Sequence, residues 1–149
     1  MPPVIVEGDF WSQNVMFWPD EKGQAGAKMS GIFDYQFAHP GSCMEDLCVM
    51  VFTSCPAELR RKEWKNIVTH YYSALSSALN GKVPFSREQA ERAFRAMEPW
   101  ALLFLVGSTP LWPTMAHVTR APDPEEAIDR LVKRAEAVVQ DVWPDCVRT

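Results

Sequence analysis

The stretch Glu7-Gly8-Asp9-Phe10-Trp11-Ser12-Gln13-Asn14-Val15-Met16-Phe17 decides the fold of this chain of 149 residues. Val4-Ile5-Val6 precedes it, and Val15-Met16-Phe17-Trp18 closes it. Both runs are short and apolar, and the first is β-branched, as is typical of strands. The sequence therefore predicts two short strands joined by a loop that carries both Asp9 and Asn14.

A β-hairpin is predicted to follow this loop. Asp20-Glu21-Lys22-Gly23 forms a polar turn, Gln24 to Lys28 prolongs it, and Met29 to Phe33 is the next apolar run. Asp34 comes directly after that run. Because side chains leave the core where a strand ends, we expect Asp34 to be available for chemistry.

From Ser42 onward the sequence predicts helices. Ser42 with Glu45, and Ser86 with Gln89, have the spacing of a capping box, in which two side chains satisfy free amides at a helix start. A buried helix is expected from Cys43 to about Thr53. Further helices are expected between Pro56 and Gly81, from Ser86 through Met97, and from Asp123 to Val142, with one long loop at 108–124. Strands followed by helices make an α+β arrangement that is mainly helical.

Composition excludes two classes of partner. With 47% hydrophobic residues and a net charge of -4, the chain can bury one core but has no basic footprint for nucleic acid. The most apolar run, Trp100 to Val106, is far shorter than the roughly 20 residues that span a membrane, so it reads as a buried helix. No secretory signal opens the chain, and the four cysteines have no paired spacing. We therefore expect reduced thiols and a cytoplasmic location.

The acidic residues suit phosphoryl transfer. That reaction needs a carboxylate near the attacking hydroxyl and oxygen ligands for Mg²⁺. Asp9 and Asn14 are five positions apart on one loop, and Asp34 follows the next hairpin. This is the kinase arrangement of a catalytic Asp, an Asn and a metal-binding Asp. An Asp and an Asn at this spacing are common by chance, so the surrounding residues matter more.

Four motifs in order carry a resemblance. They are Glu7 to Phe17, then Gly31-Ile32-Phe33-Asp34-Tyr35-Gln36, then His39-Pro40-Gly41, then Glu45-Asp46-Leu47. Together they resemble the CHK kinase-like family, which includes ecdysteroid-kinase-like proteins and is related to choline and aminoglycoside kinases. The last two motifs most resemble its nematode branch. The resemblance covers Val4 to about Tyr72 and continues more loosely to about Met97.

The resemblance implies the C-terminal lobe of a protein kinase-like fold. The catalytic and metal loops would lie at 4–46 and a helical subdomain at 42–142, while the N-terminal ATP-binding lobe would be absent from 1–149. Asp9 would be the catalytic base for the hydroxyl of a small-molecule acceptor. Asn14 and Asp34 would hold Mg²⁺ on the phosphates of ATP.

Three further residues receive lesser roles. By resemblance, Gln36 would lie near a second metal or the acceptor, and Asp46 would brace the catalytic loop. Trp11 is a candidate for lining an acceptor pocket, although an aromatic beside a core strand more often packs. Simpler interpretations remain open for the other residues too. Asp9 could be a turn acid, Asn14 a loop cap and Asp34 an exposed acid at a strand end.

Two departures from the family bear on activity. Position 7 is Glu where the family usually has His, and a carboxylate beside Asp9 and Asp34 should raise at least one pKa. No Gly-rich phosphate loop and no strand lysine with a partner glutamate precede Val4. We therefore expect a phosphotransferase that is incomplete and inactive as this chain alone. The alternative is a pseudokinase-like module that binds a protein, or itself, through apolar surface left open by the missing lobe. The identity of the acceptor is not encoded in these motifs.

Overall fold

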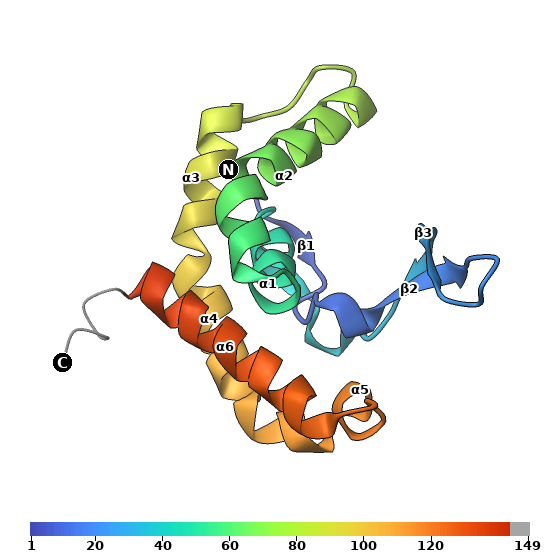
Figure 1. Ribbon diagram of the computed structural model, residues 1–149. Coiled ribbons are helices and arrows are strands. Elements are labelled where there is room, and N and C mark those ends of the chain that lie inside the picture. The colour runs from blue at the N-terminus through green and yellow to red at the C-terminus, as the bar shows by residue number, and fades with distance from the viewer. Residues whose placement is uncertain (144–149) are drawn as a thin grey trace.

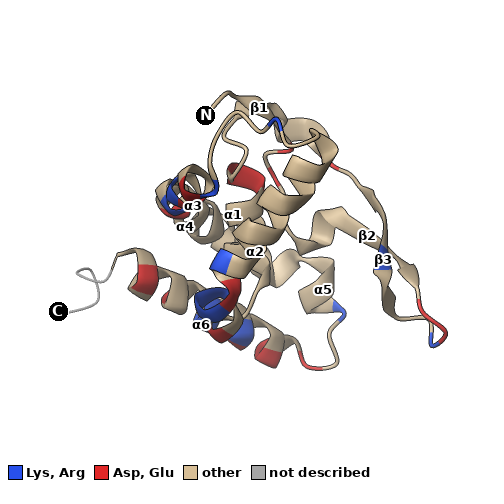
Figure 2. Cartoon of the chain, turned by 90° about the horizontal axis from the view of Figure 1, so that it is seen from above, with Lys and Arg blue, Asp and Glu red and all other residues tan. Residues whose placement is uncertain are grey.

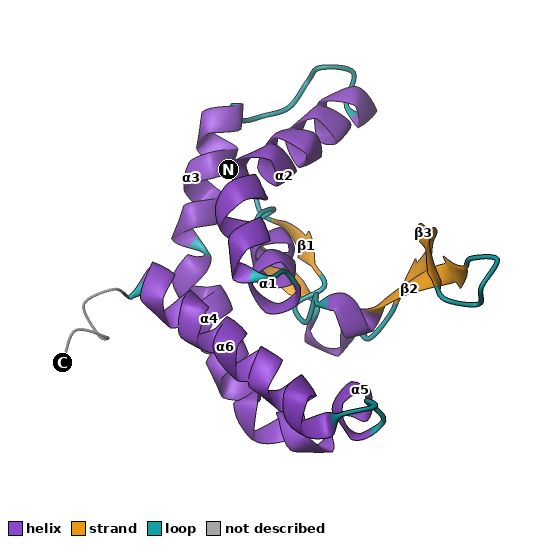
Figure 3. Ribbon diagram, in the orientation of Figure 1, coloured by secondary structure: helices purple, strands orange, loops and turns teal. Residues whose placement is uncertain are grey.

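The computed structural model describes residues 1–143 of the chain. Strands and short 3-10 turns occupy the first 41 residues, and helices occupy most of the remainder (Figures 1 and 3). The predicted α+β, mainly helical class is confirmed. The strands are β1 (Val4–Val6), β2 (Val15–Pro19), β3 (Ala25–Ile32) and β4 (His39–Gly41), with 3-10 helices η1 (Ser12–Asn14) and η2 (Tyr35–Phe37).

The strands form two separate antiparallel pairs. β1 pairs with β4, so that Val4 faces Gly41 and Val6 faces His39. β2 and β3 form the predicted hairpin, which projects to one side of the helices (Figure 1). β3 begins at Ala25, so the prediction of a longer turn and a strand start at Met29 is wrong. The physical reason is that the side chain of Asp20 accepts the amides of Lys22 and Gln24, which closes the turn early.

The helices pack around α1, which is the central element of the core. Its buried apolar residues share one core cluster with Phe94, Ala101 and Leu105 from later helices. The helices are α1 (Glu45–Ser54), α2 (Ala57–Ala78), α3 (Arg87–Ala96), α4 (Glu98–Ser108), α5 (Ala116–Thr119) and α6 (Pro124–Val142), with the 3-10 helix η3 (Thr109–Thr114) between α4 and α5.

Helix ends show where local sequence was sufficient. The capping box of Ser86 and Gln89 is present at the start of α3, with both reciprocal hydrogen bonds. The Ser42 and Glu45 capping box is wrong, because α1 begins at Glu45 and has no side-chain cap. The carboxylate of Glu45 instead contacts His39 of β4, with Nε2 and Oε1 3.2 Å apart. A tertiary contact has therefore replaced the local one.

Two apolar segments differ from expectation. Trp100 to Val106 is helical, as part of α4, but Trp100, Leu103 and Val106 are exposed, so the prediction of a fully buried helix is wrong. An all-apolar run carries no periodicity to mark its outer face. The predicted loop at 108–124 is largely helical, since η3 and α5 lie within it.

The thiols agree in part with the cysteine prediction. Cys43, Cys48 and Cys55 are free, and the first two are buried, while Cys146 lies outside the described residues. Burial raises the pKa of the Cys48 thiol above its ordinary value, which suits an inert core residue. Among residues 1–143, no helix is long and apolar enough to cross a membrane.

Candidate functional site

A left-handed glycine starts the loop that carries Asp9. Gly8 has φ +87°, a conformation that side chains with a Cβ rarely adopt. A Cβ built at this position would lie 2.4 Å from the carbonyl oxygen of Phe37. The backbone of η2 therefore passes directly against the loop, and only glycine leaves room for it.

Asp46, in the first turn of α1, is hydrogen-bonded to the backbone at the start of this loop. Its carboxylate accepts hydrogen bonds from the backbone amides of Glu7 at 2.8 Å and Gly8 at 3.0 Å. Hydrogen bonds to a carboxylate are stronger than neutral ones. The contacts are those that the predicted bracing role requires.

Asn14 orients the carboxylate of Asp9. Its side-chain Nδ2 donates to Oδ2 of Asp9 at 3.0 Å and to the Asp9 backbone oxygen at 2.9 Å. Asn14 is only 5% exposed, at the end of η1. One contact uses Oδ2 of Asp9 and the other its backbone oxygen, so Oδ1 of Asp9 and Oδ1 of Asn14 take part in neither.

Asp34 is joined to the same loop through the backbone. The amide of Phe33 donates to the carbonyl oxygen of Asn14 at 3.1 Å. Asp34 follows with φ 69° and ψ 51°, a left-handed conformation that is uncommon outside glycine. Its side chain is exposed. Such conformations often occur at functional sites, where surrounding contacts maintain them.

Glu7 adds a buried carboxylate to Asp9, Asp34 and Asp46, and these four residues are called the acidic group below. It is 6% exposed, its Oε2 accepts the amide of Asp9 at 2.8 Å, and its Oε1 is buried with no partner among residues 1–143. Burial raises the pKa of Glu7, although the amide of Asp9 lowers it. The negative charges of Asp46, Asp9 and Asp34 raise this pKa further.

The pKa of Asp9 is raised as well. Burial is the main cause, and the charge of Asp34 adds to it, while the hydrogen bond from Asn14 opposes both. The raised pKa of Glu7 agrees in direction with the prediction for a Glu at position 7, although burial contributes more than the neighbouring acids. A bound cation would relieve that repulsion.

These raised values predict a pH dependence of stability. A carboxyl whose pKa is higher in the folded than in the unfolded chain binds its proton more tightly when folded. The free energy of unfolding should therefore fall as pH rises through the ordinary value of 4.5 for Glu7 and on through its raised folded value. We expect Glu7→Gln to show a smaller fall between pH 4 and pH 8, measured by urea denaturation at several pH values.

A matched control for that experiment is Glu21→Gln, which removes an exposed acid from the hairpin turn. The control should follow the wild-type pH dependence. If Glu7→Gln also follows it, the buried carboxylate does not contribute as argued.

The donors present fit Mg²⁺ on a phosphate ligand. Mg²⁺ commonly takes only one or two carboxylates from the protein and completes its shell with phosphate oxygens and water. Asp34 and Oδ1 of Asn14 offer one charged and one neutral oxygen. No group of three or more His, Cys, Asp or Glu suited to a metal occurs within the part of the chain that the structure describes.

Trp11 and Gln36 lie at the edges of this group. The indole of Trp11 meets the ring of His117 on α5 edge to face, with centroids 6.0 Å apart, and its Nε1 is buried without a partner in the described residues. Gln36 is exposed on η2. Both residues stay candidates, with Trp11 packed against the helix that follows η3.

One contact of the loop could not be predicted from the sequence. The amide of Ser12 donates to Oγ of Ser54, at the end of α1, at 2.9 Å. Both ends of α1 therefore contact the loop, through Asp46 near the start of the helix and Ser54 at its end. The two residues are 42 positions apart, and a serine in an apolar helix carries no local signal of such a role.

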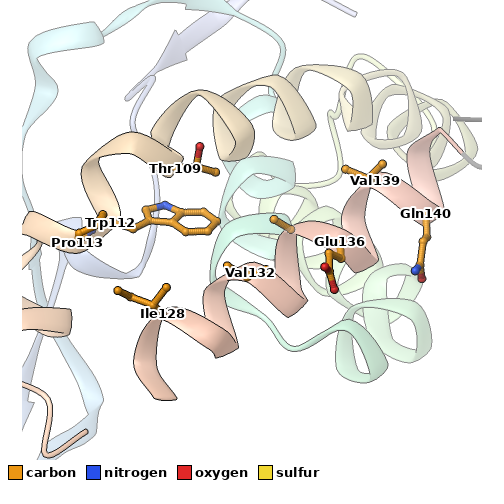
Figure 4. Close-up of a pocket in the computed structure, with 9 residues that line it drawn as sticks. Thr109, Trp112, Pro113, Ile128, Val132, Glu136, Val139 and Gln140 are labelled. Atoms are coloured by element: carbon orange, nitrogen blue, oxygen red, sulfur yellow. The ribbon is translucent and has the colours of Figure 1, made fainter. Parts of the chain in front are cut away.

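A large apolar cavity lies apart from these acids. It has a volume of about 600 Å³ and lies between η3 and α6, where Trp112 of η3 faces Ile128 and Val132 of α6 (Figure 4). Asp9, Asn14 and Asp34 are not among its lining residues. The acidic residues of the loop are therefore separate from this cavity.

A comparison with models of known protein families gave a match to this chain. A family model described as DUF1679, uncharacterized oxidoreductase dhs-27, matches residues 1–144. That family is a nematode family related to kinase-like and ecdysteroid-kinase proteins. No curated protein and no solved structure matches the chain. The match includes both the acidic loops and the helices that support them.

Proposed function

Because the chain belongs to the DUF1679 family, we propose that it carries the acid and metal-binding half of a small-molecule phosphotransferase site. The fold would correspond to the C-terminal lobe of a CHK kinase-like domain. The donor would be ATP with Mg²⁺, and the acceptor a hydroxyl group on a small molecule.

One observation carries this proposal. Asn14 fixes Oδ2 of Asp9 through a hydrogen bond of 3.0 Å, while Oδ1 accepts no hydrogen bond from residues 1–143. A carboxylate held in this way can accept a proton from a hydroxyl at a defined position, which is how a catalytic base contributes. Asp34 and Asn14 would hold the ion that neutralises charge on the transferred phosphoryl group.

The family description includes the word oxidoreductase, which applies to the protein it names. The seven glycines of this chain are scattered, and no Gly-x-Gly-x-x-Gly run occurs in its 149 residues. That run is the usual sequence signature of a dinucleotide-binding turn. We therefore base the proposal on the acidic group.

The 149 residues also contain no Gly-rich kinase loop. Such a loop covers the phosphates, and a strand lysine pairs with them. We expect this chain alone not to turn over ATP. Turnover by the purified chain that Asp9→Ala abolishes would contradict this expectation.

A magnesium-dependent ATP titration by calorimetry tests the half-site. We expect weak binding that requires Mg²⁺ and is reduced at least about tenfold by Asp34→Ala, because a carboxylate ligand is lost. Asp129→Ala is the matched control, since Asp129 is an exposed acid on α6. Equal binding by both variants would contradict the assignment of Asp34.

A second candidate function is protein binding by a non-catalytic module. Exposed apolar side chains gather on the projecting hairpin and support it: Met16, Phe17, Trp18 and Met29. A folded sample that binds no Mg²⁺ and ATP at high concentration would favour this candidate. Under this candidate function, the chain would bind either another protein or a second copy of itself.

A further inference from the structure

A group of arginines lines a cavity that includes none of the acids of the loop. The cavity has a volume of about 230 Å³ and lies where the first turns of α2 meet α3, the start of α4 and the end of α6. Figure 2 shows the charged segments of α2 and α6 side by side. The charged residues that line the cavity are Arg60, Arg61, Arg95, Glu98 and Asp141.

Arg60 is the most deeply placed of these residues. It is 2% exposed, and its guanidinium lies 4.7 Å from the ring centroid of Phe52. Nη2 contacts the carboxylate of Asp141. Nη1 is buried and has no partner among residues 1–143. A buried charged group with an unsatisfied donor is costly, so such donors are normally paired.

The acids do not balance the arginines. Asp141 is shared, because Arg61 also binds it, with Nη2 and Oδ1 2.9 Å apart. Glu98 pairs with Arg95 at 2.9 Å. Among residues 1–143, three guanidinium groups therefore line the cavity with two carboxylates.

A purely structural role explains part of this group. The contact of Arg60 with Asp141 joins the start of α2 to the end of α6, 81 residues later. It explains neither the unpaired Nη1 of Arg60 nor the cavity itself. Arg61 and Arg95 are each about half exposed, which leaves their remaining donors accessible at the cavity mouth.

We propose that this cavity binds a small oxyanion of the phosphate class. Guanidinium groups present paired donors that match phosphate oxygens, and several of them together discriminate a dianion from chloride. At about 30 Å³ for each water, the cavity of about 230 Å³ holds roughly eight waters, enough for a phosphate group with a small substituent. None of its lining residues belongs to the Asp9 loop. The proposal is therefore independent of the proposed phosphotransferase function.

Calorimetric titration with inorganic phosphate, without Mg²⁺ and at an ionic strength matched with chloride, tests the site. We expect Arg61→Gln and Arg95→Gln each to weaken binding about tenfold, because each removes a charged donor. Arg87→Gln is the matched control: Arg87 is on α3 like Arg95, is half exposed, and pairs with the acids Glu88 and Glu91. Asp34→Ala should bind phosphate as the wild type does.

A second measurement uses Asp141→Asn, which leaves Arg60 without a carboxylate. We expect phosphate to raise the melting temperature of this variant more than that of the wild type, because the anion replaces the lost charge. The proposal is overturned if phosphate does not bind, if Arg87→Gln loses binding as fully as Arg95→Gln, or if phosphate stabilises Asp141→Asn no more than the wild type. Loss of phosphate binding in Asp34→Ala would instead assign the anion to the acidic loop and also overturn it.

Discussion

Gly8→Ala is expected to lower the free energy of unfolding by about 2–4 kcal/mol and to abolish binding of Mg²⁺ and ATP. Two causes act together. The left-handed φ of +87° is strained for alanine, and the new Cβ would meet the Phe37 carbonyl oxygen at 2.4 Å. Because the neighbour is backbone, η2 must move away from the loop. Urea denaturation and the calorimetric titration measure the two effects.

Gly107→Ala is the control for that substitution. Gly107 lies in α4, near its end, and a Cβ there would meet nothing within 4 Å. Alanine should therefore stabilise the helix by up to about 1 kcal/mol. The two Gly→Ala changes are thus expected to differ in sign. A loss below 1 kcal/mol for Gly8→Ala would show that η2 does not press on the loop as described.

Phe94→Ala should cost about 3–5 kcal/mol of unfolding free energy. Phe94 is 0% exposed and stacks on Trp64 with ring centroids 5.6 Å apart and an interplanar angle of 12°. Phe52 packs against it at 6.2 Å. Removing the ring leaves a cavity at the junction of α1, α2 and α3. Domains of ordinary size have only about 5–15 kcal/mol in total, so the variant should be close to unfolded at 37 °C.

Phe17→Ala is the matched control for Phe94→Ala. Phe17 is an exposed side chain of β2 on the projecting hairpin. Its truncation should cost less than about 1 kcal/mol, because little apolar area is returned to water. Similar losses for the two variants, measured by chemical denaturation, would place the principal core elsewhere.

The two capping-box motifs show what the sequence could and could not predict. Both have the same spacing, yet only Ser86 and Gln89 form the box. Glu45 is 7% exposed and lies against Gly41, where an added Cβ would be 2.7 Å from its Oε2. The pairing of β1 with β4 puts Gly41 there. Local spacing contains no information about that long-range pairing, so it could not separate the two cases.

Within the acidic site, the contact between Asp9 and Asn14 could be predicted from the sequence. Asp9 and Asn14 are five residues apart on one loop, and their contact follows from that proximity. Asp46 reaches the loop from 38 residues away, and the resemblance, rather than the residue pattern, suggested it. The arginine cavity was not predicted. Arg60, Arg95 and Asp141 are separate helix residues in the sequence, and only packing brings them together.

The pairing of β1 with β4 has a consequence for the order of folding. The strands are separated by residues 7–38, and the hairpin of β2 and β3 lies within that interval. Once the hairpin has formed from local contacts, the flexible part of the interval falls from about 32 to about 14 residues, which reduces the entropy cost of closure by roughly 0.7 kcal/mol. The hairpin should therefore form before β1 and β4 meet. If the turn between β2 and β3 forms slowly, the loop that carries Asp9 will also assemble slowly, although that turn contributes no residue to the loop.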